Sequence, residues 1–306
     1  MPLRAFREIL LKTLFVVACS FAALPLMSQT VSPTVSPVAV PIVANDNQVP
    51  AGVLKDGVVT LLLELRKGNW HPEREDGDAI PAYAFGEAGK PLQVPGPAIR
   101  VPQGTAIDVT LRSFIGVPAT VHGLHARPGK DSDVVTVPAG GSAHVRFVAE
   151  APGTYLYWAR TPDGRRGNNR GLDALLGAAL VVDPPGTPAN DRIFVFERWN
   201  GPTRTAINGK SWPTSEPILL REGLRHRLVF DNRSTDDHPV HLHRHNFELI
   251  SVRGAALSGV HKDVVIVEAG TIVEADLVAN NPGDTLFHCH QQDHMDSGFM
   301  ALFRYS

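Results

Sequence analysis

The stretch of this sequence with the clearest chemistry is His288-Cys289-His290, which is followed by His294. Cysteine thiolate and histidine imidazole are the side-chain ligands that bind copper and zinc. Because successive side chains point to opposite faces of a strand, a strand here would turn His288 and His290 to one face and Cys289 to the other. The sequence therefore predicts two metal sites, back to back on one segment.

A second group of histidines lies upstream, in residues 237–247, at positions 238, 241, 243 and 245. Eight of the 13 histidines of the chain follow position 237. A single histidine is usually an ordinary polar residue, but two compact clusters that share one cysteine indicate metal binding. Asp236 and Asp237 precede this run, either as acceptors that orient an imidazole or as turn residues.

The choice of metal follows from the ligand types. One thiolate with two imidazoles suits a trigonal copper site that has a weak axial position, and Cys289 with His238 and His294 would supply that set. Zinc sites usually have four tight ligands and often use paired cysteines. The chain has only two cysteines, and Cys19 lies near the N-terminus, so copper is favoured.

These residues match a known family signature, HPxHxH followed by HCHxxxHxxxG. His238 to His243 and His288 to Gly298 carry it almost completely. The pattern resembles the C-terminal signature of the multicopper oxidases, the family that includes the laccases. The resemblance implies that His238, Cys289 and His294 bind a type 1 (blue) copper and carry the catalytic electron transfer. It also implies that a trinuclear copper cluster is faced by His241, His243, His288 and His290.

The axial position of the blue copper in this family lies ten residues after the cysteine, which here is Phe299. A residue that does not coordinate favours a higher reduction potential, because the oxidised copper loses a donor. Met300 is adjacent, and a bulge in the strand would be needed to turn it toward the metal. Strand alternation instead predicts that Phe299 faces the cofactor and that Met300 fills the core.

Length and composition indicate two domains. The chain has 306 residues, of which 43% are hydrophobic and 20% charged, enough for two substantial cores. A net charge of −2 excludes nucleic acid as a principal partner, since that needs a basic surface.

Short β-type runs separated by glycine and proline predict an all-β fold. We expect two cupredoxin-like Greek-key β-sandwich domains, at residues 53–184 and 185–306, with a proline-rich junction at 184–188. The predicted strands are 58–65, 98–101, 106–111, 143–148, 154–158, 175–182, 193–196, 226–230, 247–252, 264–267, 272–277 and 286–290.

The N-terminus predicts export to the periplasm or the cell exterior. Basic residues precede an apolar run at 14–26, as in a signal peptide, assigned here to residues 1–28. Two alternatives leave a membrane tether at the N-terminus: a lipoprotein signal with lipidated Cys19, or an uncleaved anchor. Residues 29–52, rich in proline and serine, are expected to form an extended tether. With Cys19 in the signal, Cys289 has no partner for an intramolecular disulfide.

The first domain resembles the family at residues 94–101, 120–125 and 152–157, but departs from it at the copper ligands. The family offers two His-x-His pairs here, whereas this chain has Thr120-Val121-His122 and Trp158-Ala159-Arg160. Of the eight expected cluster histidines, three are therefore replaced, and His122 is the one left in this domain. Arg160 carries a permanent positive charge and no acceptor, which opposes loading of nearby copper ions.

Three functions are consistent with this pattern. The first is an exported copper oxidoreductase that takes single electrons from a small-molecule or protein donor. Reduction of dioxygen then needs a complete cluster, which a homotrimer cannot restore because symmetry repeats the same first domain. The second is a blue-copper electron-transfer or copper-binding protein without oxidase activity, or with one copper at the cluster position, as in copper nitrite reductases. The third is a metal-free sandwich.

Overall fold

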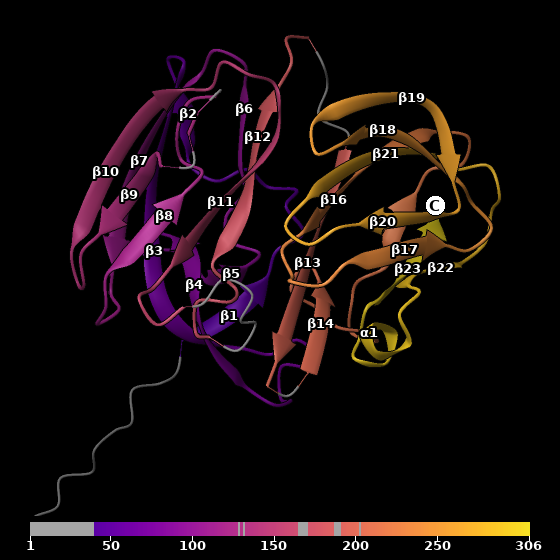
Figure 1. The fold of residues 1–306 in the computed structure, drawn as a ribbon, viewed down its shortest axis with the longest axis horizontal. Coiled ribbons are helices and arrows are strands. Elements are labelled where there is room, and N and C mark those ends of the chain that lie inside the picture. Colours follow the sequence, from indigo (N-terminus) through magenta and orange to yellow (C-terminus); the bar gives the residue numbers. More distant parts are fainter. Residues whose placement is uncertain (1–39, 128, 131, 165–170, 187–190, 202) are drawn as a thin grey trace, which may run out of the picture. The chain divides into compact units, whose positions relative to one another are not determined.

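Two β-sandwich domains and one short helix make up the part of the chain that the computed structural model describes (Figure 1). That part comprises residues 40–127, 129–130, 132–164, 171–186, 191–201 and 203–306. The predicted all-β, cupredoxin-like sandwich class is confirmed. The predicted signal peptide lies outside the described residues. Within them, no helix is long and apolar enough to span a membrane.

The first domain has two facing sheets. One has the strand order β1-β5-β4-β3-β7-β10, with β2 paired to β3, and the other has the order β6-β12-β11-β8-β9. The strands are β1 (Pro41–Ala44), β2 (Val53–Lys55), β3 (Val58–Trp70), β4 (Ile80–Glu87), β5 (Leu92–Val94), β6 (Ile99–Pro102), β7 (Ala106–Ser113), β8 (Ala119–His122), β9 (Val134–Val137), β10 (Ser142–Val148), β11 (Gly153–Arg160) and β12 (Gly177–Asp183).

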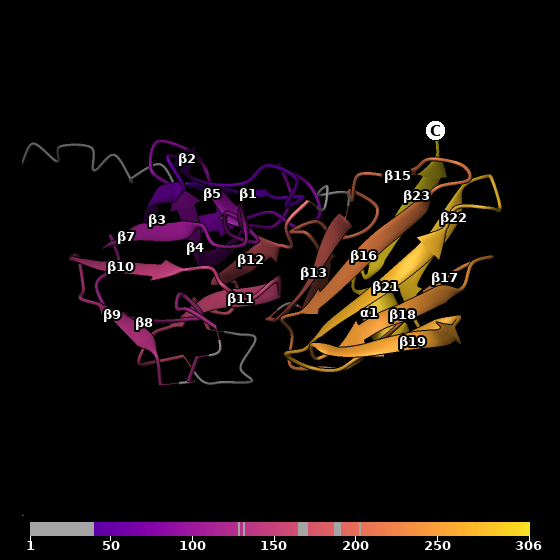
Figure 2. The same cartoon turned by 90° about the horizontal axis from the view of Figure 1, so that it is seen from above.

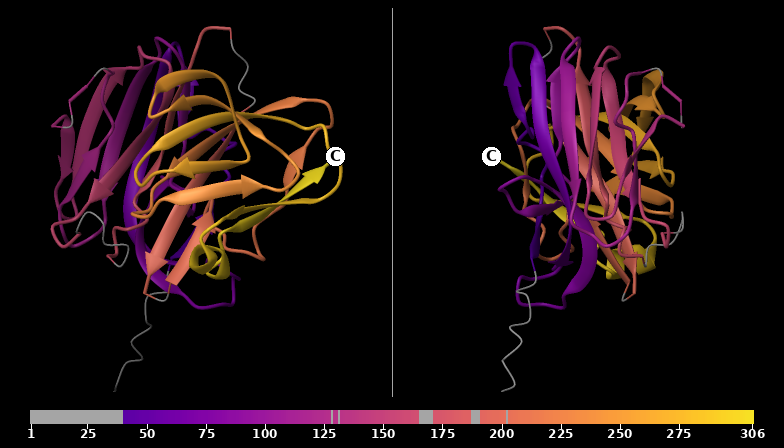
Figure 3. Two further views of the ribbon diagram at one scale, coloured as in Figure 1. Left: turned by 45° about the vertical axis from the view of Figure 1, so that its right-hand side comes forward. Right: turned by 90° about the vertical axis from the view of Figure 1, so that its left-hand side faces the viewer.

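The second domain repeats this arrangement with the orders β14-β13-β16-β21-β18-β19 and β15-β23-β22-β17-β20. Figure 2 shows the strands β16, β21, β18 and β19 side by side, and Figure 3 gives two further views. Its elements are β13 (Asp191–Asn200), β14 (Thr203–Ile207), β15 (Ile218–Leu220), β16 (Arg225–Asn232), β17 (His238–Leu242), β18 (Phe247–Val252), β19 (Ala255–Lys262), β20 (Val264–Val267), β21 (Ile272–Val278), β22 (Thr285–Cys289), α1 (Gln292–Asp296) and β23 (Met300–Tyr305).

The core of the second domain is rich in phenylalanine and supports the metal-binding strands. The rings of Phe194, Phe196, Phe230 and Phe287 lie with centroids 5.6 to 6.4 Å apart, and all four side chains are buried. Close packing of large rings fixes their rotamers. The strands that carry the metal-ligand candidates therefore rest on a rigid layer.

Part of the segment predicted as an extended tether, residues 29–52, is a strand in the structure. Residues 41–44 form β1, which pairs in parallel with both β3 and β5. Ile42 is buried in the core, and the side chain of Asn45 donates a hydrogen bond to the Gly96 carbonyl over 3.0 Å. A segment rich in proline and valine is thus held as a strand because β3 and β5 both offer it backbone hydrogen-bonding groups.

A group of charged side chains is buried where the two sandwiches meet. Glu197 on β13, Asp231 on β16 and Arg233 lie close together: Arg233 lowers the pKa of both carboxyls, and Asp231 raises that of Glu197. The backbone N–H of Gly209 donates to Glu197 Oε2 over 3.2 Å, and Arg233 donates to the Leu176 carbonyl of the first domain over 3.4 Å. Burial raises the pKa of Glu197 well above its ordinary value and that of Asp231 to about 7.

Candidate metal centre

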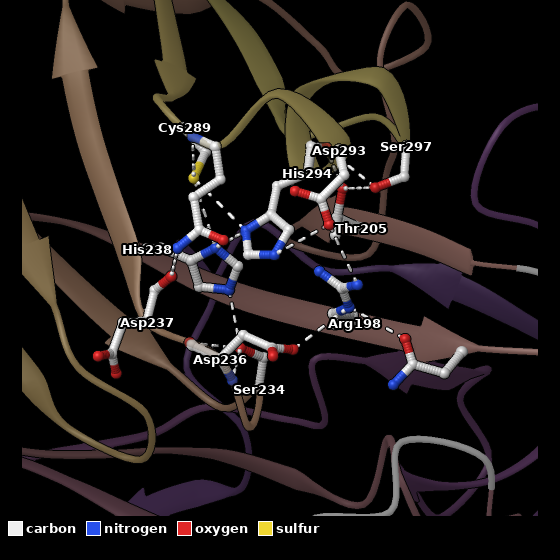
Figure 4. Close-up of polar contacts among 12 residues, drawn as sticks. Arg198, Thr205, Ser234, Asp236, Asp237, His238, Cys289, Asp293, His294 and Ser297 are labelled. Carbon is white, nitrogen blue, oxygen red and sulfur yellow. Dashed lines mark hydrogen bonds and ion pairs between the residues drawn. The ribbon is translucent and has the colours of Figure 1, made fainter.

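Three buried side chains of the second domain, His238, Cys289 and His294, converge on one point (Figure 4). Cys289 Sγ lies 3.7 Å from His238 Nδ1 and 3.5 Å from His294 Nδ1, and the two Nδ1 atoms are 3.0 Å apart. We call these three residues the buried site. No other group of three or more potential ligands in the described part of the chain brings its donor atoms this close together.

Strand pairing and one glycine bring the buried site together. Cys289 ends β22, and β17, which begins at His238, pairs with β22 in antiparallel register. His294 lies on α1, and its backbone carbonyl accepts a hydrogen bond from Thr205 Oγ1 over 2.9 Å. The chain then turns at Gly298, where φ is +110° and a Cβ would approach Ser211 Cβ to 2.6 Å. Only glycine fits there, which gives a physical reason for the last residue of the HCHxxxHxxxG motif.

Neighbouring polar groups orient His238. Ser234 Oγ lies 2.7 Å from its Nε2, and Ser234 is itself held by Asn232 and by the Asp236 carbonyl. An imidazole whose Nε2–H donates to this hydroxyl presents the lone pair of Nδ1 toward Cys289. The site thus favours the tautomer that a metal ligand needs.

The electrostatics of the buried site suit a metal. Burial lowers the pKa of His238 to about 3, with further lowering by His294 and Arg198, and burial and Arg198 lower that of His294. Both rings are therefore neutral at pH 7, the form that coordinates. Burial raises the pKa of the Cys289 thiol to about 11, so a bound cation has to displace its proton.

Phe299 and Met300 lie on different sides of the strand that begins beside them. Phe299 is fully buried and its ring stacks on His238, with the centroids 4.6 Å apart. Met300 pairs with His288 across β22 and β23. The axial role of Phe299 stays a prediction, but it is Phe299 that contacts a residue of the buried site.

Four further histidines, predicted to face a copper cluster, lie together on the other side of the same strands. They are His241, His243, His288 and His290, which we call the surface histidine cluster. His243 Nε2 and His288 Nε2 are 2.9 Å apart, and the rings of His241 and His290 have centroids 5.1 Å apart. His241 Nδ1 lies 2.7 Å from the Asp263 carbonyl and His288 Nδ1 lies 2.9 Å from the Cys289 carbonyl. These contacts leave the Nε2 atoms for coordination.

The first domain brings together the four positions at which the family has histidines, but three of them carry other residues. Strands β8 and β11 place His122 opposite Trp158 and Thr120 opposite Arg160. The His122 and Trp158 rings stack with centroids 3.9 Å apart and planes inclined by 5°, and the Arg160 guanidinium lies over the indole at 5.1 Å. His122 Nε2 is buried. The structure therefore places His122 in an aromatic stack with Trp158.

Several residues around the buried site belong to no motif in the sequence. Ser234, Thr205 and Arg198 reach it from loops and strands of their own, and only the fold reveals them. Asp236 and Asp237, both noted from the sequence, make different contacts. Asp236 pairs with Arg198 over 3.3 Å, whereas Asp237 accepts a long-range hydrogen bond from the Ala269 N–H over 2.9 Å.

The family model described as multicopper oxidase matches residues 184–306, which span the whole second domain. The first domain shares the same fold with solved two-domain copper proteins. A blue copper oxidase from Nitrosomonas europaea superposes with a TM-score of 0.68 at 22% identity, covering 80% of this chain and 85% of that one. The second domain therefore matches the multicopper oxidase family, and the described chain shares its fold with a solved blue copper oxidase.

Two curated relatives are similar to parts of this chain. Multicopper oxidase MmcO of Mycobacterium tuberculosis is 40% identical over 99 residues, which is 32% of this chain and 19% of the relative. A probable nitrite reductase-hydroxylamine oxidoreductase fusion protein of Kuenenia stuttgartiensis is 27% identical over 282 residues, 81% of this chain and 32% of the relative. The chain thus spans a third or less of these two curated relatives.

Copper is the cofactor that the multicopper oxidase family implies, and the buried site fits it. The site offers a thiol and two neutral imidazoles, all within 4.8 Å of one another. Soft thiolate with imidazole is a donor set suited to copper. A fourth close protein donor, which zinc would favour, is replaced in the described surroundings by the phenyl ring of Phe299.

Proposed function

We propose that the protein is an exported copper oxidoreductase in which His238, Cys289 and His294 hold a type 1 copper. The observation that carries this proposal is the buried group of two histidines and one cysteine, with Phe299 packed on His238. Copper bound there would accept one electron at a time from a reduced small molecule or a protein donor. We expect no role for nucleic acid as a partner.

The protein's own residues prepare the site for this task. His238 and His294 supply neutral ring nitrogens, and Phe196 and Phe299, whose ring centroids are 4.7 Å apart, keep water away. A dry, rigid site holds the same ligand geometry before and after electron transfer. Cys289 is bonded along the backbone to His288 and His290, so the buried site and the surface histidine cluster are covalently adjacent.

We further propose that the surface histidine cluster takes less copper than the trinuclear site of a full oxidase. The support is the first-domain patch, where the stack of His122, Trp158 and Arg160 replaces imidazole donors. A homotrimer would bring a second copy of this same patch. On this reading dioxygen reduction is weak or absent, and the alternative function is a blue-copper electron carrier or copper-binding protein.

The decisive experiment is to load the purified soluble part of the chain with copper. Copper per chain, the visible spectrum and oxygen uptake with a phenolic donor are then measured together. We expect a blue band, fewer copper ions than a type 1 site plus a trinuclear cluster require, and little oxygen uptake. A full complement with rapid turnover would overturn the reduced-cluster proposal, and a colourless oxidised protein would overturn the type 1 site.

The surface histidine cluster can be tested separately. The double variant His243→Ala/His288→Ala removes the pair whose Nε2 atoms are 2.9 Å apart. We expect it to bind about one copper fewer per chain while keeping the blue band, because neither residue belongs to the buried site. The exposed His261→Gln serves as the control and should change neither quantity. Loss of the blue band in the double variant would show that the two sites are not independent.

The axial position gives a further prediction. Replacing Phe299 by methionine puts a thioether where the ring now packs on His238, and a weak axial donor stabilises the oxidised metal. We expect the reduction potential to fall by about 60 mV, tenfold in the one-electron equilibrium constant. Spectroelectrochemical titration measures it. Met300→Leu is the matched control; a shift in that variant, with none in Phe299→Met, would assign the axial position to Met300.

A further inference from the structure

Arg198 is a largely buried cation that no motif identifies and that lies against the metal-ligand histidines. It is on β13 two residues beyond Phe196, so both side chains point to the same face of the strand, and Phe196 contacts the His238 ring at 5.8 Å. The Arg198 side chain is only 13% exposed. Figure 4 shows its guanidinium beneath the rings of the buried site.

The guanidinium links the two segments that carry His238 and His294. Arg198 Nε lies 3.3 Å from Asp236 Oδ2, two residues before His238, and its terminal nitrogen lies 3.6 Å from Asp293 Oδ2, the residue before His294. Nε also donates to Asn200 Oδ1 over 3.0 Å. Arginine is suited to such a bridge because its planar fork contacts two acceptors at once.

The two carboxylates are more exposed than the guanidinium that they contact. The side chain of Asp236 is 39% exposed and that of Asp293 69%, whereas Arg198 is 13% exposed and His294 2%. Solvent therefore screens the negative charges more than it screens the guanidinium. At His238 and His294 the guanidinium therefore acts more strongly than either carboxylate, and it disfavours each further positive charge placed beside it.

On the basis of the proposed type 1 copper, we infer that Arg198 is a positioning residue that holds the two ligand segments together and raises the reduction potential of the buried site. When a donor gives up one electron to the metal, the charge of the site falls by one. A fixed cation nearby stabilises that reduced form relative to the oxidised one.

The experiment compares copper-loaded wild type with Arg198→Gln, Arg198→Lys and Asp293→Asn by spectroelectrochemical titration with redox mediators. Arg198→Gln should lower the one-electron equilibrium constant for reduction about tenfold, a fall of about 60 mV. Arg198→Lys keeps the charge but not the fork and should recover most of that shift. Asp293→Asn removes a compensating negative charge and should shift the potential upward.

Arg204→Gln is the matched control, because Arg204 lies on the adjacent strand β14 and pairs with Glu73 over 2.7 Å. Its potential should match that of wild type. An unchanged potential in Arg198→Gln, or an equal shift in Arg204→Gln, overturns the inference. If Arg198→Gln fails to fold, Asp293→Asn decides the matter: an upward shift supports the inference, and a downward or absent shift overturns it. A wild type without a blue band instead overturns the proposed function.

Discussion

Replacement of Cys289 by serine is expected to abolish the blue absorption band completely. The band requires a thiolate bound to copper, and a serine hydroxyl does not ionise in this range and is a poor ligand for copper. Cys289 is the one free cysteine in the described part of the chain and is 1% exposed, so no nearby thiol can replace it. Copper per chain should fall by about one, measured by metal analysis next to the visible spectrum.

The protein fold should survive the change to serine. Oxygen and sulfur differ little in size, and burying one hydroxyl costs about 1–3 kcal/mol, which a thermal melt of the metal-free protein would show. The surface histidine cluster lies on the other side of β22 and should keep its copper. A blue band that persists in Cys289→Ser would exclude Cys289 as the ligand and with it the type 1 assignment.

The sequence was a good guide to the second domain because its strands follow simple alternation. The predicted strands 247–252 and 264–267 coincide with β18 and β20. The predicted strand 58–65 extends to Trp70 in β3, although the buried positions shift from odd to even residue numbers at Gly68. Glycine marks a probable strand end in a sequence, but here it permits close packing: a Cβ on Gly68 would meet the Val40 carbonyl at 2.6 Å.

The helix α1 shows where local patterns fail. It has five residues, too few for a helical period, and its cap at Gln291 makes no side-chain hydrogen bond. It is held by tertiary contacts, such as the bond from Thr205 to the His294 carbonyl. Short helices depend on such packing. The metal-ligand role of His294 could be inferred from the family motif, but its place on a helix could not.

The candidate site divides in the same way. His238, Cys289 and His294 are close in space because β17 and β22 pair, and the motif spacing already encodes that pairing. Arg198 and Ser234 come from β13 and from the loop after β16, and arginine and serine are common residues with no distinctive spacing. Their importance follows from burial and distance, which only the folded chain provides.

In the first domain the sequence predicted missing copper ligands, and the structure shows what occupies their positions. The sequence alignment placed Thr120, His122, Trp158 and Arg160 at expected ligand positions, and the register of β8 and β11 sets these four residues in adjacent pairs. Trp158 does more than lack a donor, since it covers the His122 ring. At these positions the chain therefore has a packed stack of His122, Trp158 and Arg160.

Replacement of Asp231 by asparagine is expected to stabilise the metal-free protein at neutral and higher pH. Burial raises the pKa of this carboxyl to about 7 in the folded chain, although Arg233 acts in the opposite direction, and Glu197 nearby adds negative charge when ionised. In the unfolded chain the carboxyl ionises near pH 3.9. Between these values the folded state holds a proton that the unfolded state has released, so stability falls as pH rises.

The size and the pH window of this effect can be measured directly. The free energy of unfolding of Asp231→Asn relative to wild type should increase by about 2–3 kcal/mol between about pH 5 and pH 7 and then level off. Denaturant titrations at a series of pH values give this difference, and the exposed Asp78→Asn should show no comparable slope. If instead the advantage of Asp231→Asn shrinks with rising pH, the carboxylate is stabilised as an anion by Arg233. An advantage that grows with pH instead shows that the buried carboxyl is protonated in the folded protein up to about pH 7.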